Sequence, residues 1–371
     1  MRILRKIVAI LYKYALKPVL FLFDPEKVHE LFLWVGEKLG SYKWAKTFTR
    51  KLFRYDNKIL RIEIDGIKLK NPIGLSAGFD KDANLQNILY EVGFGYMQIG
   101  SVTAKPYGGN QGPRLHRLKK SRGIVVNYGL KNLGVNKIIE KLEGYKNLRF
   151  PVSISIARSN HPDTSSIESA IEDYFYSFEK LYENNIGDFY TLNISCPNVK
   201  DRDLFYKTGF LEKLLEKISE LGIQKPIFVK MPPLEWNKLK GLLEVIIKYE
   251  LKGIILSNLE KDKERLNLRD KVPGHVSGGI SGKPIEKLTN ELIKKTYKEY
   301  GEKLVIIGCG GVFSAADAYT KIKSGASLVQ LITGMIYEGP QLIGQINHGL
   351  KKLLKRDGYK HVSEAVGVDV K

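Results

Sequence analysis

The sequence Leu304-Val-Ile-Ile-Gly308-Cys-Gly-Gly311-Val-Phe-Ser314 decides the expected fold, because a short apolar run leads into a glycine cluster and then into a helical pattern. Its near-continuous apolar character suits a parallel strand that is covered on both faces of its sheet. Eight runs of this kind occur, each followed by a helical stretch: 72–77, 96–102, 152–156, 189–195, 226–231, 253–258, 303–308 and 327–333. Eight strand–helix units predict an α/β fold, a (β/α)8 TIM barrel with long connections after the second and sixth strands.

Each of the eight runs ends, at its carboxyl side, in residues with chemistry, and this fold places its active site at the carboxyl ends of its strands. One such residue is usually a cap or a turn, but eight of eight are hard to explain as turns alone. They are Gly78 and Lys81, Ser101, Ser155, Asn193 with Ser195 and Cys196, Lys230, Ser257 and Asn258, Gly308 to Gly311, and Thr333 with Gly334. The pattern predicts an active site on this face of the barrel.

Two glycine clusters follow the seventh and eighth runs, at Gly308–Gly311 and Thr333-Gly334. Barrel enzymes often hold a phosphate there with backbone N–H groups, which glycine allows to approach closely. A third cluster, Gly278-Gly279-Ile-Ser-Gly-Lys283, could close the same cradle, although its spacing is not that of a P-loop. We therefore expect a phosphate-bearing cofactor.

Composition excludes several other classes of protein. The 371 residues carry 60 Lys+Arg against 40 Asp+Glu, a formal charge of +20, but the excess is mostly lysine and lacks the arginine–aromatic pattern of nucleic-acid modules. We expect no nucleic-acid partner. Two cysteines and six histidines without ligand spacing predict no disulfide framework and no metal site.

The first 58 residues hold a net charge of +8 and two amphipathic patterns. The first spans residues 3–14 and is expected to end or kink at Pro18, and the second begins at Asp24-Pro-Glu26 and presents Val28, Leu31, Phe32, Trp34, Val35 and Leu39. Such helices fit a segment lying in a membrane interface, or they simply pack on the main domain. We expect a helical segment at 1–58, then a β-hairpin at 60–70 that opens a barrel domain at 59–371.

Several ordered motifs resemble those of dihydroorotate dehydrogenases, FMN-dependent enzymes of pyrimidine biosynthesis. They are Phe23-Asp-Pro-Glu-Lys-Val-His29, Gly74-Leu-Ser-Ala-Gly-Phe-Asp-Lys81, Gly93-Phe-Gly-Tyr-Met-Gln-Ile-Gly-Ser-Val-Thr103, Asn193-Ile-Ser-Cys-Pro-Asn198, Ser277-Gly-Gly-Ile-Ser-Gly-Lys-Pro284, Ile306-Ile-Gly-Cys-Gly-Gly311 and Gly325-Ala-Ser-Leu-Val-Gln330. The Asp-Pro-Glu stretch and the paired helices are similar to the membrane-associated, quinone-reducing class.

The resemblance implies a set of site residues. FMN would be held by Ala77, Gly78, Lys81, Ser101, Ser155, Asn193, Lys230, Ser257, Gly279, Gly310, Gly311, Ile332 and Thr333. The substrate, dihydroorotate, would be bound by Lys81, Asn193, Asn198 and Asn258. Cys196 would be the catalytic base, poised by nearby lysine charge, whereas Cys309 is expected only to pack behind its glycine loop.

The chain departs from the family pattern at five places. Cys196 stands where the quinone-linked class has Ser, Val126 where the family has a substrate-contacting Asn, Ser155 where it has a flavin-contacting Asn, and Leu259 where it typically has Thr, and the 199–203 loop is altered. Asn127 or Asn132 could substitute for the missing Asn. The flavin cradle therefore matches the family better than the substrate pocket does.

The leading hypothesis is a peripheral-membrane enzyme that oxidises dihydroorotate to orotate and passes electrons to a quinone, on the cytoplasmic side of an inner membrane. An alternative keeps the FMN and the cysteine base but takes another dihydropyrimidine or an enoate. A third is a membrane-bound flavoprotein without turnover.

Overall fold

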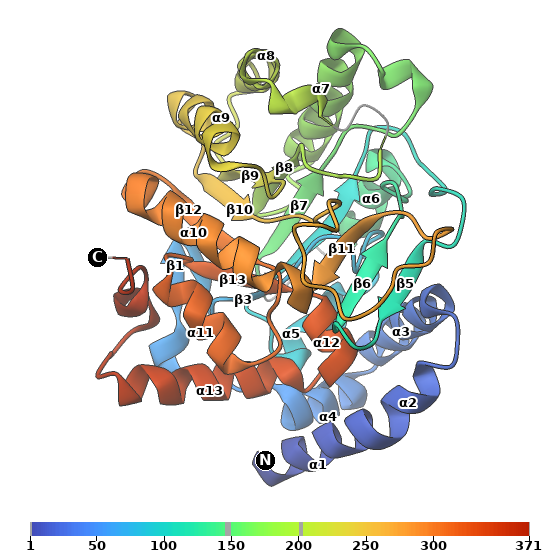
Figure 1. Cartoon of the computed structure of the whole chain (residues 1–371), viewed down its shortest axis with the longest axis vertical. Helices are drawn as coiled ribbons and strands as arrows, with labels where there is room; N and C mark the ends of the chain where they lie inside the picture. Colours follow the sequence, from blue (N-terminus) through green and yellow to red (C-terminus); the bar gives the residue numbers. More distant parts are fainter. Residues whose placement is uncertain (1, 145–149, 200–202, 371) are drawn as a thin grey trace.

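A closed barrel of eight parallel strands forms the centre of the protein, in the order β10-β12-β13-β3-β4-β7-β8-β9 (Figure 1). The computed structural model describes residues 2–144, 150–199 and 203–370. The barrel strands are β3 (Ile73–Leu75), β4 (Tyr96–Val102), β7 (Val152–Ile156), β8 (Phe189–Asn193), β9 (Ile227–Met231), β10 (Gly253–Leu256), β12 (Val305–Cys309) and β13 (Leu328–Leu331). Each predicted run overlaps one of these strands, so the predicted barrel is confirmed.

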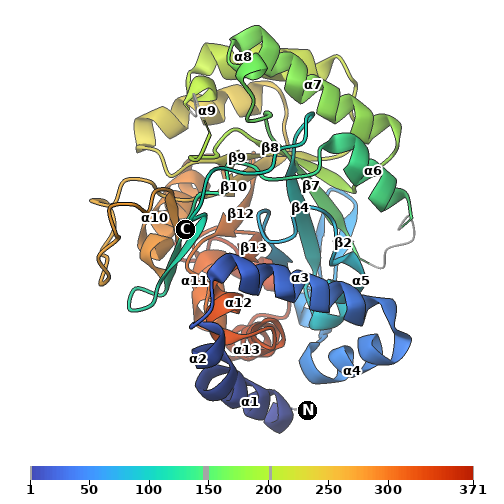
Figure 2. The same cartoon turned by 90° about the vertical axis from the view of Figure 1, so that its right-hand side faces the viewer.

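Helices surround the barrel and follow its strands in turn (Figures 1 and 2). They are α5 (Gln86–Val92), α6 (Val135–Glu143), α7 (Ile167–Glu183), α8 (Thr208–Ser219), α9 (Trp236–Lys248), α10 (Glu286–Tyr300), α11 (Ala315–Lys323), α12 (Thr333–Glu338) and α13 (Leu342–Arg356). In α9 the buried residues Leu239, Leu242, Leu243 and Ile246 recur at helical spacing, so this helix turns one apolar face to the core.

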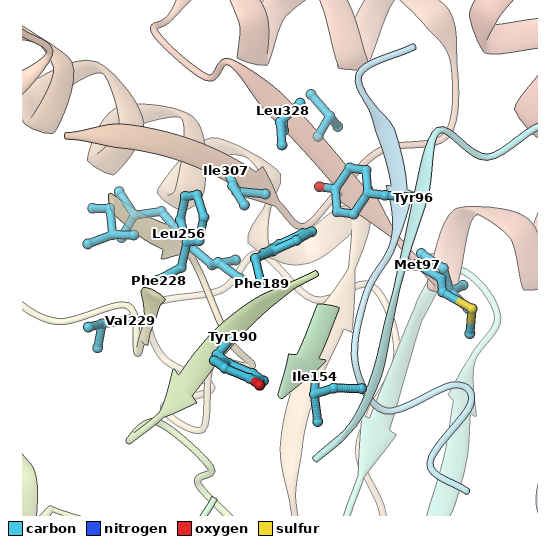
Figure 3. Close-up of a cluster of buried hydrophobic side chains, with 14 of the residues drawn as sticks. Tyr96, Met97, Ile154, Phe189, Tyr190, Phe228, Val229, Leu256, Ile307 and Leu328 are labelled. Carbon is cyan, nitrogen blue, oxygen red and sulfur yellow. The ribbon is translucent and has the colours of Figure 1, made fainter. Parts of the chain in front are cut away.

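Aromatic rings pack between the strands near their amino ends (Figure 3). Tyr96 and Phe189 lie with ring centroids 5.9 Å apart, and Phe189 and Phe228 with centroids 5.7 Å apart. Each ring comes from the first or second residue of its strand. These rings fill space at the amino end of the barrel, whereas the polar residues of the sequence motifs lie at the carboxyl ends of the strands.

The two long connections build a second sheet outside the barrel. Strands β5 (Leu115–Leu118) and β6 (Gly123–Val126) come from the connection after β4, and β11 (Gly279–Gly282) comes from the connection after β10. They pair antiparallel in the order β11-β6-β5. The expectation of two long connections is confirmed, whereas the strands within them were not predicted.

The N-terminal helices gather at one end of the molecule, beside α12 and α13 (Figures 1 and 2). They are α1 (Arg2–Leu11), a π-helical turn (Tyr12–Leu16), α2 (Lys17–Leu20), α3 (Pro25–Ser41) and α4 (Lys43–Phe53). Proline lacks the N–H that an α-helix needs in its interior. The wide turn precedes Pro18 and the helix continues to Leu20, so the irregularity falls one turn earlier than expected.

Helix α3 begins as the sequence predicts, because the Asp24 carboxylate accepts hydrogen bonds from the Glu26 and Lys27 N–H groups. The prediction that six apolar residues of α3 share one buried face is wrong for two of them. Val28, Phe32, Val35 and Leu39 face the barrel, but Leu31 and Trp34 are 48% and 58% exposed.

The hairpin predicted at 60–70 is confirmed as β1 (Ile62–Ile64) and β2 (Ile67–Leu69). Within the described ranges, no helix has the length and apolarity to span a bilayer.

Candidate active site

A cavity of about 480 Å³ extends from the carboxyl ends of the barrel strands to the N-terminal helices. Its barrel end is lined by polar residues of the strand ends, including Ser76, Asn193, Lys230 and Ser257. Its other end is lined by apolar side chains of α2 to α5 and of the residues that cap α2 and α5, which are Leu20, Phe21, Val28, Phe32, Val35, Leu39, Phe53, Leu85, Ile88, Leu89 and Val92. One continuous cavity thus has a polar part and an apolar part.

The charges on the cavity wall all have one sign. Lys81, Arg117, Lys131 and Lys230 line it, and no Asp or Glu is among its described lining residues. Lys131 pairs with Glu26 and Glu30 outside the lining, but Lys81 and Lys230 have no ion-pair partner among the described residues. Cations without a partner in a water-poor cavity favour anionic ligands, because desolvated charge is costly. The polar part is therefore suited to phosphate and carboxylate groups.

Lys230 is fixed by β9 at the barrel end of the cavity, where its side chain is almost fully buried. Its Nζ donates a hydrogen bond to Ser76 Oγ at 3.2 Å, and no described carboxylate lies within ion-pair distance. Burial lowers the pKa of Lys230 below its usual range. Such an ammonium gains most when negative charge develops next to it.

Cys196 follows β8 and lines the polar part of the cavity with its side chain partly exposed. Burial raises the pKa of the thiol to about 11, although the Asn198 N–H and the charges of Lys230 and Lys261 act in the opposite direction. The lysine charges lower the pKa of the thiol, as expected, but desolvation raises it by more, so the net shift is upward. A neutral thiol is the resting form at neutral pH.

The amide and hydroxyl groups of the strand ends form one hydrogen-bonded group. Asn193 Nδ2 donates to Ser101 Oγ at 2.7 Å, and the hydroxyls of Ser101 and Ser155 lie 2.8 Å apart. Asn258 Nδ2 donates to Ser195 Oγ at 2.9 Å. These bonds fix the directions of the remaining donors and acceptors toward the cavity, which is the kind of rigid support that a binding site needs.

Asn198 reaches the cavity from the loop after β8. Its Nδ2 donates to the Val126 carbonyl at 2.8 Å, and its Oδ1 is buried without a partner in the described part of the chain. A buried unpaired oxygen of this kind is costly and is best explained by a ligand donor. The side chain of Val126 supplies no polar group here. Asn127 and Asn132 do not line the cavity, so neither takes the place of the absent Asn.

Lys81 lies in the loop after β3, where its Nζ sits 3.8 Å from the centre of the Tyr128 ring and 3.5 Å from His29 Nε2. Burial lowers the pKa of Lys81 to about 8. Both partners are uncharged at neutral pH, because burial and the charge of Lys81 lower the pKa of His29 to about 3. The ammonium therefore keeps its charge available to the cavity.

Glycines leave space along the same wall. Gly78 has φ +106, and a Cβ placed there would meet only Ile332 Cδ1 at 3.9 Å, so it would project into open cavity. Gly311 has φ +76, and a Cβ there would approach Glu286 Cβ to 2.3 Å. Gly78 therefore keeps the backbone accessible to a ligand, whereas Gly311 allows its loop to approach the start of α10 closely. Thr333 lies alongside, with its hydroxyl 2.9 Å from Ser281 Oγ.

The structure brings most of the predicted site residues together. The cavity is lined by Ala77, Gly78, Lys81, Ser101, Asn193, Cys196, Asn198, Lys230, Ser257, Asn258, Gly310, Gly311, Ile332 and Thr333. Ser155 and Gly279 do not line it: Ser155 stands behind Ser101, and Gly279 pairs with Val126 in the second sheet. Of the altered 199–203 loop, residues 200–202 lie outside the described part. Leu259 lines the cavity.

Three of the lining residues that sequence reasoning missed bear on the chemistry of the site. Cys309 reaches the cavity with its Sγ 3.6 Å from Ser76 Oγ, so it does more than pack behind the glycine loop. His29 and Tyr128 contact Lys81 from other elements. The sequence motif that contains His29 could be recognised, but His29 is 52 positions from Lys81 in the chain. Only the tertiary structure brings the two side chains into contact.

The protein is a (β/α)8 barrel whose cavity has a cationic part at the strand ends and an apolar part beside it. This architecture is that of a barrel enzyme that binds a cofactor. The family described as dihydroorotate dehydrogenase matches residues 59–354. Curated relatives named dihydroorotate dehydrogenase (quinone) include one from Christiangramia forsetii, 37% identical over 93% of this chain and 99% of its own, and one from Trichodesmium erythraeum, 35% identical over 96% and 98%. The chain belongs to the dihydroorotate dehydrogenase family.

Solved structures agree with this assignment. The crystal structure of the Eimeria tenella enzyme in complex with ferulenol superposes with a TM-score of 0.81 at 25% identity, covering 93% of this chain and 96% of that one. The resemblance drawn from the sequence motifs is therefore confirmed at the level of the family. Enzymes of this family use a flavin.

Proposed function

We propose that this protein oxidises dihydroorotate to orotate in pyrimidine biosynthesis and passes the electrons to a membrane quinone. The observation that carries the proposal is the single cavity with two parts, one cationic at the strand ends and one apolar under the N-terminal helices. A carboxylate substrate and a phosphate-bearing flavin suit the first part. A quinone, which is apolar, suits the second.

FMN is the flavin that the residues fit. Gly78 leaves open space at the wall, and Lys230 presents a buried ammonium without a carboxylate partner. Ala77, Gly78, Lys81, Ser101, Ser155, Asn193, Lys230, Ser257, Gly279, Gly310, Gly311, Ile332 and Thr333 would hold it, with Ser155 and Gly279 acting from behind the wall. When bound, the flavin accepts a hydride from the substrate and supplies electrons to the quinone.

The substrate would be bound by Lys81, Asn193, Asn198 and Asn258. The Lys81 ammonium pairs with the carboxylate, and the unpaired Oδ1 of Asn198 accepts a hydrogen bond from a ring N–H. Dihydroorotate offers both groups. Cys196 takes the proton from one ring carbon while hydride leaves the neighbouring carbon, so its thiolate is the reactive form and its thiol is the product of the step.

The N-terminal segment, residues 1–58, would lie on a membrane and admit the quinone, while residues 59–371 form the flavin-binding domain. Of the sixteen most exposed large apolar side chains in the described residues, fourteen lie between positions 4 and 48. A dense apolar surface beside basic residues is typical of an interfacial segment. We place the protein peripherally on the cytoplasmic side of an inner membrane.

Anaerobic mixing of the FMN-loaded enzyme with dihydroorotate tests the proposal. The flavin absorbance is expected to bleach within seconds and to return when a quinone is added. Bleaching by another dihydropyrimidine or an enoate, but not by dihydroorotate, would favour the alternative substrate. Bleaching by none of these would leave a flavoprotein without turnover.

The rate of this bleaching is expected to rise with pH. Because burial raises the pKa of Cys196 to about 11, the thiolate fraction increases about tenfold per pH unit throughout the neutral range. The limiting rate at saturating dihydroorotate should follow that slope from about pH 7 to pH 9 in stopped-flow experiments. A flat profile over this range would contradict a thiolate base with a raised pKa.

Membrane binding is expected to depend on the exposed apolar residues of the N-terminal segment. Leu22 is 81% and Trp34 58% exposed, so replacing either by Asp should not disturb folding. Each change should weaken sedimentation with phospholipid vesicles about tenfold, since it removes one or two kcal/mol of apolar burial. Tyr176→Asp is the matched control, because Tyr176 is exposed on α7 at the opposite end of the molecule (Figure 2). Equal binding by all variants would contradict the proposed surface.

A further inference from the structure

His29 belongs to the N-terminal segment, yet its ring lies in the active-site cavity. Helix α3 carries it over the strand ends, where the ring packs edge-to-face on Phe79 with centroids 4.8 Å apart. Its Nε2 is 3.5 Å from the Nζ of Lys81. Phe79 and Lys81 are two residues apart in one loop, so His29 contacts that loop at two points.

The direction of the contact follows from the chemistry of the two groups. An ammonium has no acceptor, so Lys81 donates and His29 Nε2 accepts with its lone pair. The imidazole in turn bonds to the backbone of Phe79, and burial keeps the ring uncharged at neutral pH. His29 is thus a neutral acceptor whose orientation is fixed from a second side.

Lys81 has few other groups to hold it. Its Nζ rests on the face of Tyr128 at 3.8 Å, and among the described residues no carboxylate comes within ion-pair distance. A ring face attracts a cation but does not set the direction of its N–H groups. His29 is therefore the hydrogen-bond partner that orients this ammonium.

Ion pairs hold α3 in the position that this contact requires. Glu26, one turn before His29, accepts from Arg114 Nε at 2.9 Å and lies 3.6 Å from Lys131 Nζ. Arg114 and Lys131 flank the second sheet and the loop that carries Tyr128. These pairs are half-buried and join the N-terminal segment directly to the residues around Lys81.

We infer that His29 is a positioning residue for the substrate, because its Nε2 holds the Lys81 ammonium where the substrate carboxylate meets it. The inference rests on the proposed function, in which Lys81 binds that carboxylate. The segment that faces the membrane then also completes the substrate site. Substrate affinity, and not only quinone reduction, depends on α3.

Two substitutions in the full-length, FMN-loaded enzyme test the inference. His29→Phe keeps an aromatic ring on Phe79 but removes the acceptor, whereas His29→Gln keeps an acceptor near the Nε2 position. We expect His29→Phe to raise the dissociation constant for orotate, read from the shift in flavin absorbance, about tenfold. The dissociation constant for dihydroorotate in the reductive step should rise in parallel, with a smaller change in the limiting rate. His29→Gln should restore most of the affinity, and Lys38→Ala, an exposed change on α3, should leave it unaltered.

Three results would overturn the inference. Wild-type orotate affinity in His29→Phe, with only flavin reoxidation by quinone slowed, would assign His29 to the quinone alone and leave the proposed function intact. Equal weakening in His29→Phe and His29→Gln would mean that the acceptor is not the cause. If the wild-type enzyme neither binds orotate nor is reduced by dihydroorotate, the proposed function fails and this inference fails with it.

Discussion

Replacing Cys196 by Ala is expected to slow the reduction of the flavin by dihydroorotate about 10³-fold, because a positioned general base contributes 10²- to 10⁴-fold. The thiol lines the polar part of the cavity beside Asn198, whereas the other cavity thiol, Cys309, lies against Ser76 at the end of β12. Asn193 and Asn198 are amides, and Lys81, whose pKa burial lowers to about 8, is mostly a cation at neutral pH. The loss should therefore appear in the limiting rate of anaerobic reduction and not in the affinity for orotate.

Cys309→Ala is the matched control for this substitution. Cys309 is the second cysteine of the chain and also lines the cavity, but its Sγ lies 3.6 Å from Ser76 Oγ at the end of β12. Its removal should change the reduction rate far less than the removal of Cys196. The reduction rate of Cys196→Ser should lie between those of Cys196→Ala and Cys309→Ala, since a hydroxyl keeps an acceptor but is harder to deprotonate than a thiol. If Cys309→Ala were the slower enzyme, the base would be assigned to the wrong cysteine.

The barrel and most of its site could be predicted from the sequence, because both depend on local patterns. Apolar runs such as Val305–Ile307 specify buried parallel strands, and the residues that follow such strands necessarily meet at one face of a barrel. Lys81, Asn193 and Lys230 are far apart in the chain and meet for that reason alone. No contact between side chains had to be known.

The remainder of the site depends on tertiary contacts that no local pattern contains. His29 reaches Lys81 only because α3 crosses the strand ends. The direction of the Cys196 pKa shift follows from how completely the loop after β8 is covered, and β11 is a strand only because β6 lies beside it. Leu31 and Trp34 have the same residue types as their buried neighbours, so their exposure could not be read from the periodicity of α3.

Replacing Lys230 by Met is expected to lower the activity strongly and to leave the stability nearly unchanged. The ammonium is buried with one hydroxyl partner, and burial lowers its pKa, so the charged form destabilises the fold in the absence of a ligand anion. Met fills a similar volume without that cost, and the thermal unfolding midpoint should not fall by more than about 2 °C. The same charge would stabilise negative charge that develops on the bound flavin. Its loss should slow reduction by dihydroorotate about 10²- to 10³-fold.

Lys321→Met separates this effect from that of removing any buried lysine. Lys321 is fully buried, but it does not line the cavity, and its Nζ donates to Thr289 Oγ1 at 2.9 Å and Asn290 Oδ1 at 2.7 Å. Its replacement leaves two acceptors unpaired and should lower the unfolding midpoint while reduction stays near the wild-type rate. Stopped-flow experiments should therefore show slow reduction in Lys230→Met only, and thermal unfolding should show a lowered midpoint in Lys321→Met only. A large loss of midpoint in Lys230→Met with a normal rate would mean that Lys230 supports the fold and not the chemistry.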